Sequence, residues 1–157
     1  MAKRKISKSY ETDCLGFPII LENVPMIFIS GEWVPEINYD LLQKCVLYFL
    51  CVAEARLTGN QIKFIRSWFR MSLQEMGSVL GVTRAAIKKW EDFADQPTNM
   101  SISTERNIRL FILEHIMPRD RKSLLKYREY VEKIINEHFS GNPEKKIKLD
   151  YEDVIAA

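Results

Sequence analysis

Apolar residues recur every three or four positions through most of the chain, which is the spacing of amphipathic helices. Proline and glycine clusters separate the runs. The predicted helices cover about 39–55 and 58–70, two short segments within 72–91, a segment from Ser103 or Thr104 that Pro118 stops, and 119–139. We therefore expect a mainly α protein with a small N-terminal β element and a C-terminal amphipathic helix.

Both ends of the chain depart from this helical pattern. Short β-prone runs lie between Leu15 and Tyr39, and so small a sheet must pack on helices or on a second copy. Residues 1–8 form a basic arm, which we interpret as mobile; contact with phosphates or a minor groove is the alternative. Residues 145–154 alternate polar and apolar side chains, and they either add one strand or stay disordered until something binds them.

Residues 72–91 have the pattern of two short helices joined by a tight turn. Ser72 and Glu75 form a capping box for the first helix, Gly81 can take the positive φ that ends it, and Thr83 caps the second. The positions expected to face inward are Met76, Val79, Leu80, Val82, Ile87 and Trp90. The outer face of the second helix then carries Arg84, Ala85, Lys88 and Lys89. A helix-turn-helix of this kind presents one helix to the major groove of DNA.

Charge is concentrated on the same part of the chain. The whole chain of 157 residues has a formal net charge of only +2. Residues 58–90 carry six basic side chains against the single acid Glu75, which gives +5, whereas residues 1–57 give −1. A protein that is attracted to DNA phosphates needs its positive charge on the segment that meets the DNA, and residues 58–90 carry it. We divide the chain into residues 1–56 (arm, β element and helix), 57–117 (helix-turn-helix DNA-binding domain) and 118–157 (C-terminal helix and tail, a candidate for dimerisation).

Several classes of protein are disfavoured by composition. No apolar run reaches the ~18 residues of a membrane span, so we expect a cytoplasmic protein with no membrane partner. The three Cys form no Cys-x-x-Cys pair and the chain has only two His, which predicts no metal, no cofactor and reduced thiols. No phosphate-binding glycine loop or nucleophile with a partner base is present, so we expect no enzyme activity; Cys14 is the one weak candidate for a nucleophile.

The run from Leu57 to Leu113 resembles the DNA-binding domain of the phage-repressor (Cro/cI, or XRE) family. Gly-Val-Thr-Arg-Ala-Ala-Ile-Lys-Lys-Trp-Glu at 81–91 is similar to that family's Gly-Val-Ser-x-x-x-Val-x-x-Trp-Glu. The resemblance implies a five-helix repressor-type helix-turn-helix domain. Its second motif helix then lies in the major groove, with base contacts from Arg84, Ala85 and Lys89. The phosphate contacts that it implies are Lys63, Ser72, Leu73, Gln74, Thr83, Lys88, Thr98 and Asn99.

A broader resemblance includes the N-terminal segment. Leu15-Gly-Phe-Pro-Ile-Ile-Leu and Gly31-Glu-Trp-Val-Pro-Glu-Ile ahead of a helix and Leu57-Thr-Gly-Asn-Gln are similar to antitoxins of the MqsA (YgiT) type. Some of those antitoxins hold zinc through paired Cys-x-x-Cys motifs, which this chain lacks.

Two functions follow as expectations. One is a transcriptional regulator, an autorepressor that binds an inverted repeat in double-stranded DNA as a homodimer, because one motif helix reads too few base pairs to be selective. The other is an antitoxin that neutralises a toxin protein and autoregulates its operon. The helix over 119–139 and the N-terminal sheet are both candidates for the dimer contact, and packing of that helix on its own domain explains its apolar stripe equally well.

Overall fold

The computed structural model describes residues 1–116, 128–129, 131–134, 136 and 146–156. Its contacts divide the chain into two units, Met1–Val46 with Glu144–Ala157, and Leu47–Pro143. Helix α1, Tyr39–Val52, begins in the first unit and ends in the second. This division differs from the one expected at residues 56 and 117, because the C-terminal segment joins the first unit.

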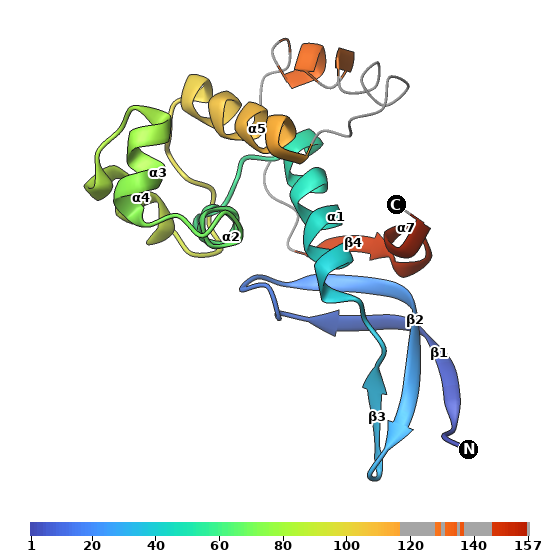
Figure 1. Cartoon of the computed structure of the whole chain (residues 1–157). Coiled ribbons are helices and arrows are strands. Elements are labelled where there is room, and N and C mark those ends of the chain that lie inside the picture. Colours follow the sequence, from blue (N-terminus) through green and yellow to red (C-terminus); the bar gives the residue numbers. More distant parts are fainter. Residues whose placement is uncertain (117–127, 130, 135, 137–145, 157) are drawn as a thin grey trace. The chain divides into compact units, whose positions relative to one another are not determined.

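The first unit is built on a four-stranded sheet whose central strand is β2, Ile19–Ile29 (Figure 1). Strand β1, Arg4–Thr12, runs antiparallel to β2 along one side. On the other side, β3, Glu32–Pro35, pairs antiparallel with residues 26–29, and β4, Ile147–Asp150, pairs parallel with residues 19–22. Two segments from opposite ends of the chain therefore share one edge of β2.

A bend in β2 separates these two pairings. Asn23 has φ 56°, in the left-handed region that asparagine tolerates better than most residues. Leu21 and Val24 are both fully buried although they are three residues apart, so the alternation of the strand shifts at the bend. The side-chain amide of Asn23 donates to the Asp150 carboxylate at 2.9 Å, which fastens the end of β4 beside it.

The C-terminal segment completes the core of this unit. Helix α7, Tyr151–Ala156, follows β4 directly, and Tyr151 and Val154 are buried. The Tyr151 hydroxyl accepts the backbone N–H of Asn38 at 2.8 Å, just before α1 begins. The last described residues thus stabilise both the sheet and the start of α1.

The predicted mainly α fold class is wrong. The chain has an α/β fold, because a mixed four-stranded sheet accompanies the helices. The expected mobile arm supplies most of β1, an edge strand that is largely exposed and so lacks the apolar alternation that reveals a strand. The tail, left open between strand and disorder, forms β4 and α7.

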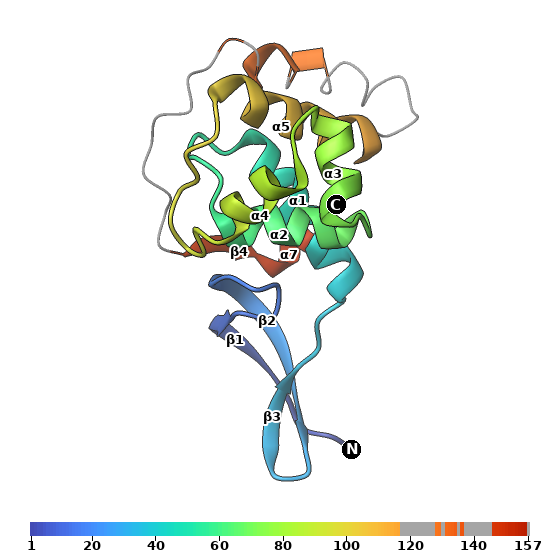
Figure 2. The same cartoon turned by 90° about the vertical axis from the view of Figure 1, so that its left-hand side faces the viewer.

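The second unit contains α2, Gly59–Trp68, α3, Leu73–Leu80, α4, Arg84–Glu91, and α5, Ile102–Ile116 (Figure 2). The side chains buried between them include Leu57, Ile62, Ile65, Met76, Ile87, Ile108 and Ile112. The helix expected over 119–139 lies mostly outside the described residues. Within that range the structure describes residues 128–129, 131–134 and 136, and these are helical.

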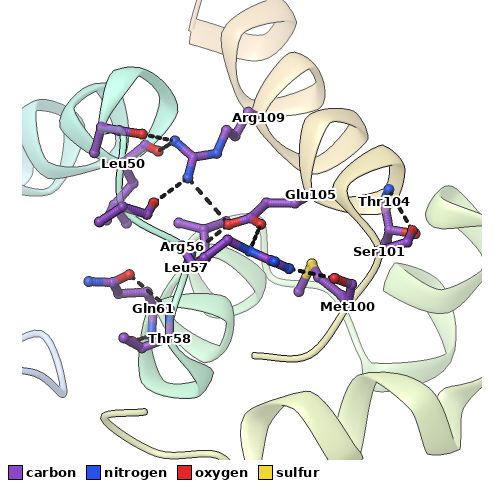
Figure 3. Close-up of polar contacts among 12 residues, drawn as sticks. Leu50, Arg56, Leu57, Thr58, Gln61, Met100, Ser101, Thr104, Glu105 and Arg109 are labelled. Carbon is purple, nitrogen blue, oxygen red and sulfur yellow. Dashed lines mark hydrogen bonds and ion pairs between the residues drawn. The ribbon is translucent and has the colours of Figure 1, made fainter. Parts of the chain in front are cut away.

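A buried polar network fixes the end of α1 and the start of α2 (Figure 3). Arg109 of α5 is fully buried and donates to the backbone carbonyls of Leu50 at 2.9 Å and Ala55 at 2.7 Å, and also to those of Cys51 and Ala53. These include the unpaired carbonyls at the C-terminal end of α1, where a cation is favourable. Burial lowers the pKa of Arg109, and the neighbouring Glu105 carboxylate opposes this shift.

Glu105 connects the same network to the loop ahead of α2. Its Oε1 accepts the N–H of Leu57 at 2.6 Å and lies 3.3 Å from Nη2 of Arg109. Arg56 forms an ion pair with the other oxygen of Glu105 and donates to the carbonyl of Met100. Thus the residues around Met100, which follow α4, are held against the start of α2 (Figure 3).

Candidate nucleic-acid interface

Helices α3 and α4 are joined by the tight turn that the sequence predicts. The Ser72 hydroxyl accepts the N–H of Glu75 at 3.1 Å, and the Glu75 carboxylate accepts the N–H of Ser72 at 2.8 Å, which confirms the capping box. Gly81 has φ 69° and ends α3 in the left-handed conformation, as expected. A Cβ on Gly77 would lie 2.7 Å from the carbonyl oxygen of Val82, so only glycine permits this close turn.

The inward face of α3 is narrower than its apolar pattern suggests. Met76 is buried as expected, but Val79 is 49% exposed, and Leu80 and Val82 are only half-buried. The expectation that Val79 faces inward and that Val82 is buried in the turn is wrong. With only eight residues, α3 has one narrow buried face, around Met76 and Gly77, and Val79 lies at its flank.

Helix α4 buries one side and exposes the other. The Thr83 hydroxyl accepts the N–H of Ala86 at 3.1 Å, which confirms the expected cap. Ile87 and Trp90 are buried, so they belong to the core. The exposed side carries all of the predicted base-contacting residues together with Lys88, namely Arg84, Ala85, Lys88 and Lys89.

An ion pair inside the unit fixes the orientation of α4. Arg66 of α2 contacts the Glu91 carboxylate through Nε at 2.5 Å and through Nη2 at 3.2 Å. Its Nη1 donates to the carbonyl of Met71, just before α3, at 3.0 Å. Glu91 is 8% exposed, and removing either partner would leave a largely buried charge unpaired. Arg66 therefore acts within the protein and ties three segments together.

Lys88 is also paired. Its Nζ lies 2.8 Å from Oδ1 of Asp92, the residue that ends α4. The hydrogen bond to Asp92 raises the pKa of the Lys88 ammonium. The side chains of Lys88 and Asp92 are 60% and 61% exposed. The predicted phosphate contact thus has an intramolecular partner, which the spacing of four residues already indicates in the sequence.

These two pairings change the charge expected on this surface. Glu91 and Asp92 lie just beyond the range 58–90 from which the net charge of +5 was counted. With Arg66 and Lys88 neutralised, four cations of that range remain without an ion pair in the described part of the chain: Lys63, Arg70, Arg84 and Lys89. The positive charge is smaller than the sequence suggests, and two of these four cations lie on α4.

The other predicted phosphate contacts differ in accessibility. Lys63, Ser72, Gln74, Thr83 and Asn99 are exposed, and Leu73 is half-buried. The N–H of Ser72 is occupied by Glu75, so it is not free for a phosphate in this structure. Thr98 is only 4% exposed, and its N–H donates to the carbonyl of Leu57 at 3.0 Å. The Thr98 side chain thus faces the protein interior, whereas Asn99 faces the solvent.

The described residues also bear on metal sites, membrane spans and reactive thiols. No group of three or more His, Cys, Asp or Glu side chains gathers there in a way that could hold a metal ion. No described helix is both long and apolar enough to cross a membrane. Cys14 is exposed, while burial raises the pKa of the Cys51 thiol to about 12.

Comparison with known proteins gives no further indication. No family model, no curated protein and no solved structure matches the chain.

Proposed function

We propose that the chain is a sequence-specific DNA-binding transcriptional regulator, an autorepressor that binds an inverted repeat as a homodimer. The observation that carries this proposal is the exposed side of α4. Arg84 begins the helix and Lys89 follows on the neighbouring line, and neither has an ion pair among the described residues. A guanidinium at the start of such a helix fits the O6 and N7 acceptors of guanine.

The surrounding contacts support the same role for α4. Core side chains, the close turn at Gly77 and the Arg66–Glu91 pair hold the helix rigidly. Rigid placement matters because base contacts depend on a fixed docking geometry. The small side chain of Ala85, beside Arg84, leaves room for a thymine methyl group.

The first test is footprinting on the DNA upstream of the protein's own gene. A protected inverted repeat there supports autoregulation and dimeric binding together, and the distance between its halves gives the separation of the two α4 helices. Absence of protection by the full-length chain at low salt, on this DNA and on random sequence, contradicts the proposal.

The second test separates base recognition from charge. Arg84→Ala is expected to weaken binding to the protected sequence by about 1–3 kcal/mol while changing nonspecific binding little. Arg84→Lys is the matched control, because it keeps the charge but loses the bidentate geometry. Equal losses on both DNAs would remove Arg84 as a base-contacting residue.

An antitoxin is the second candidate, and the sheet of the first unit favours it. Ile6, Ile29 and Val34 lie on one face of the sheet by their strand register and are 65%, 49% and 40% exposed. Exposed β-branched side chains on one face suit contact with another protein. This function adds to DNA binding. Copurification of a protein that arrests growth when expressed alone supports this function. If Ile6→Glu releases that protein and the control Lys44→Glu on α1 does not, the contact lies on the exposed face of the sheet.

A further inference from the structure

An acidic residue, Asp92, lies at the C-terminal end of the surface that α4 presents to solvent. Because successive turns bring residues four apart into line, Arg84, Lys88 and Asp92 follow one line along the helix, and Ala85 and Lys89 follow the next. All five are exposed. An unpaired carboxylate here would repel the phosphates that the neighbouring cations attract.

Helix stability does not account for Asp92. An acid at the C-terminal end of a helix is unfavourable with respect to the helix dipole. A lysine placed four residues before an acid also stabilises a helix less than an acid placed four residues before a lysine. In addition, Glu91 precedes it and already provides the carboxylate that Arg66 needs. Asp92 contributes instead by holding the Lys88 ammonium at 2.8 Å.

We propose that Asp92 determines specificity, because it neutralises Lys88 and limits attraction between α4 and phosphate regardless of sequence. This inference rests on the proposed DNA-binding function and extends it. Nonspecific binding comes almost entirely from cations that displace counterions from DNA. With Lys88 neutralised, affinity depends more on Arg84 and Lys89, whose contacts vary with the base sequence. Lys88 is thus assigned an intramolecular role in place of the expected phosphate contact.

The test uses four full-length variants: Asp92→Asn, Lys88→Gln, the double variant, and the control Asp95→Asn. Asp95 is also exposed, but it accepts from the Asn60 amide and lies beyond α4, so its substitution changes the net charge equally without releasing a lysine. Binding is measured over a series of KCl concentrations with two duplexes of equal length. One has mixed sequence, and the other is selected by the wild-type chain from a random pool.

If Lys88 is freed, Asp92→Asn binds the mixed duplex about five- to tenfold more tightly near 0.1 M salt, and the log–log salt slope steepens by about 0.9. Its preference for the selected duplex falls, because base contacts fix α4 on that duplex and limit where the freed lysine can reach, whereas on mixed sequence the chain can settle wherever the lysine meets a phosphate. Lys88→Gln exposes the Asp92 charge and weakens binding to both duplexes. The double variant returns to within about twofold of the wild type, since a neutral pair has been replaced by two neutral side chains.

Other outcomes overturn the inference. A double variant as weak as Lys88→Gln means that Lys88 itself contacts phosphate in the wild type. Equal tightening on both duplexes removes the role in specificity, and an equal effect of Asp95→Asn assigns the change to net charge alone. If the wild-type chain retains neither duplex, the DNA-binding proposal is wrong and the Lys88–Asp92 pair has no role in specificity. If the wild-type chain binds DNA but the variants do not behave as expected, only the inference about Asp92 fails.

Discussion

Replacing Arg109 by methionine removes the only cation that reaches the carbonyl groups at the end of α1 among the described contacts. Its guanidinium is fully buried, donates to four backbone carbonyls and lies 3.3 Å from Glu105. Removing one partner of a buried, hydrogen-bonded charge typically costs about 3–5 kcal/mol. Glu105 keeps Arg56 and the N–H of Leu57, so we expect the lower half of that range.

Arg128→Met is the matched control for this prediction. Arg128 is 79% exposed and lies 3.5 Å from Glu132, four residues further along the chain. An exposed pair of this spacing contributes about 0.3–0.5 kcal/mol or less. The measurement is denaturant unfolding together with hydrogen exchange at the amides of α1 and α5, because exchange reports the stability of the two helices that Arg109 joins. A loss below about 1 kcal/mol for Arg109→Met, or one equal to the control, would refute the assignment of Arg109 as the cap of α1.

Two further changes test the packing and the thiols. Gly59→Ala places a Cβ 2.5–2.7 Å from three backbone atoms at the end of α4 and beyond, so we expect the second unit to lose about 1–3 kcal/mol in denaturant unfolding. Gly31→Ala meets no atom within 4 Å, but its φ of 91° strains the turn between β2 and β3, so its effect is confined to the first unit. Burial raises the pKa of Cys51 to about 12 from 9.0, so folding opposes loss of its proton and stability falls as the pH rises above about 9. At pH near 8, iodoacetamide should modify exposed Cys14 in the native chain and Cys51 only after unfolding; equal native rates would contradict the burial of Cys51.

The features predicted correctly from the sequence are those that a few neighbouring residues determine. The capping box at Ser72 and the left-handed turn at Gly81 each need only residues within four positions, and both are present. The cap of α5 shows the limit of this local reasoning. The Ser101 hydroxyl accepts the N–H of Thr104, so α5 starts at Ile102, slightly earlier than the expected start at Ser103 or Thr104.

The features that were missed depend on contacts between distant parts of the chain. Strand β4 exists because Ile147 and its neighbours find the open edge of β2, more than a hundred residues earlier. Arg109 interrupts an apolar stripe and would ordinarily be placed on the surface, yet carbonyls more than fifty residues earlier in the chain make its burial favourable. No local pattern contains this information.

The candidate site illustrates the same limit for charge. Counting ionised side chains over 58–90 assigns six cations to the helix-turn-helix segment, but a charge acts on a ligand only as far as it is not already paired. Arg66 is paired across the fold, and only the structure shows that Glu91 lies beside it. Lys88 is paired along one helix, and the spacing of four residues to Asp92 makes that pair visible in the sequence. Because these two cations are neutralised within the protein, the field on α4 comes mainly from Arg84 and Lys89. The two residues proposed to distinguish base sequences are therefore also those that provide the unpaired positive charge of α4 in the described part of the chain.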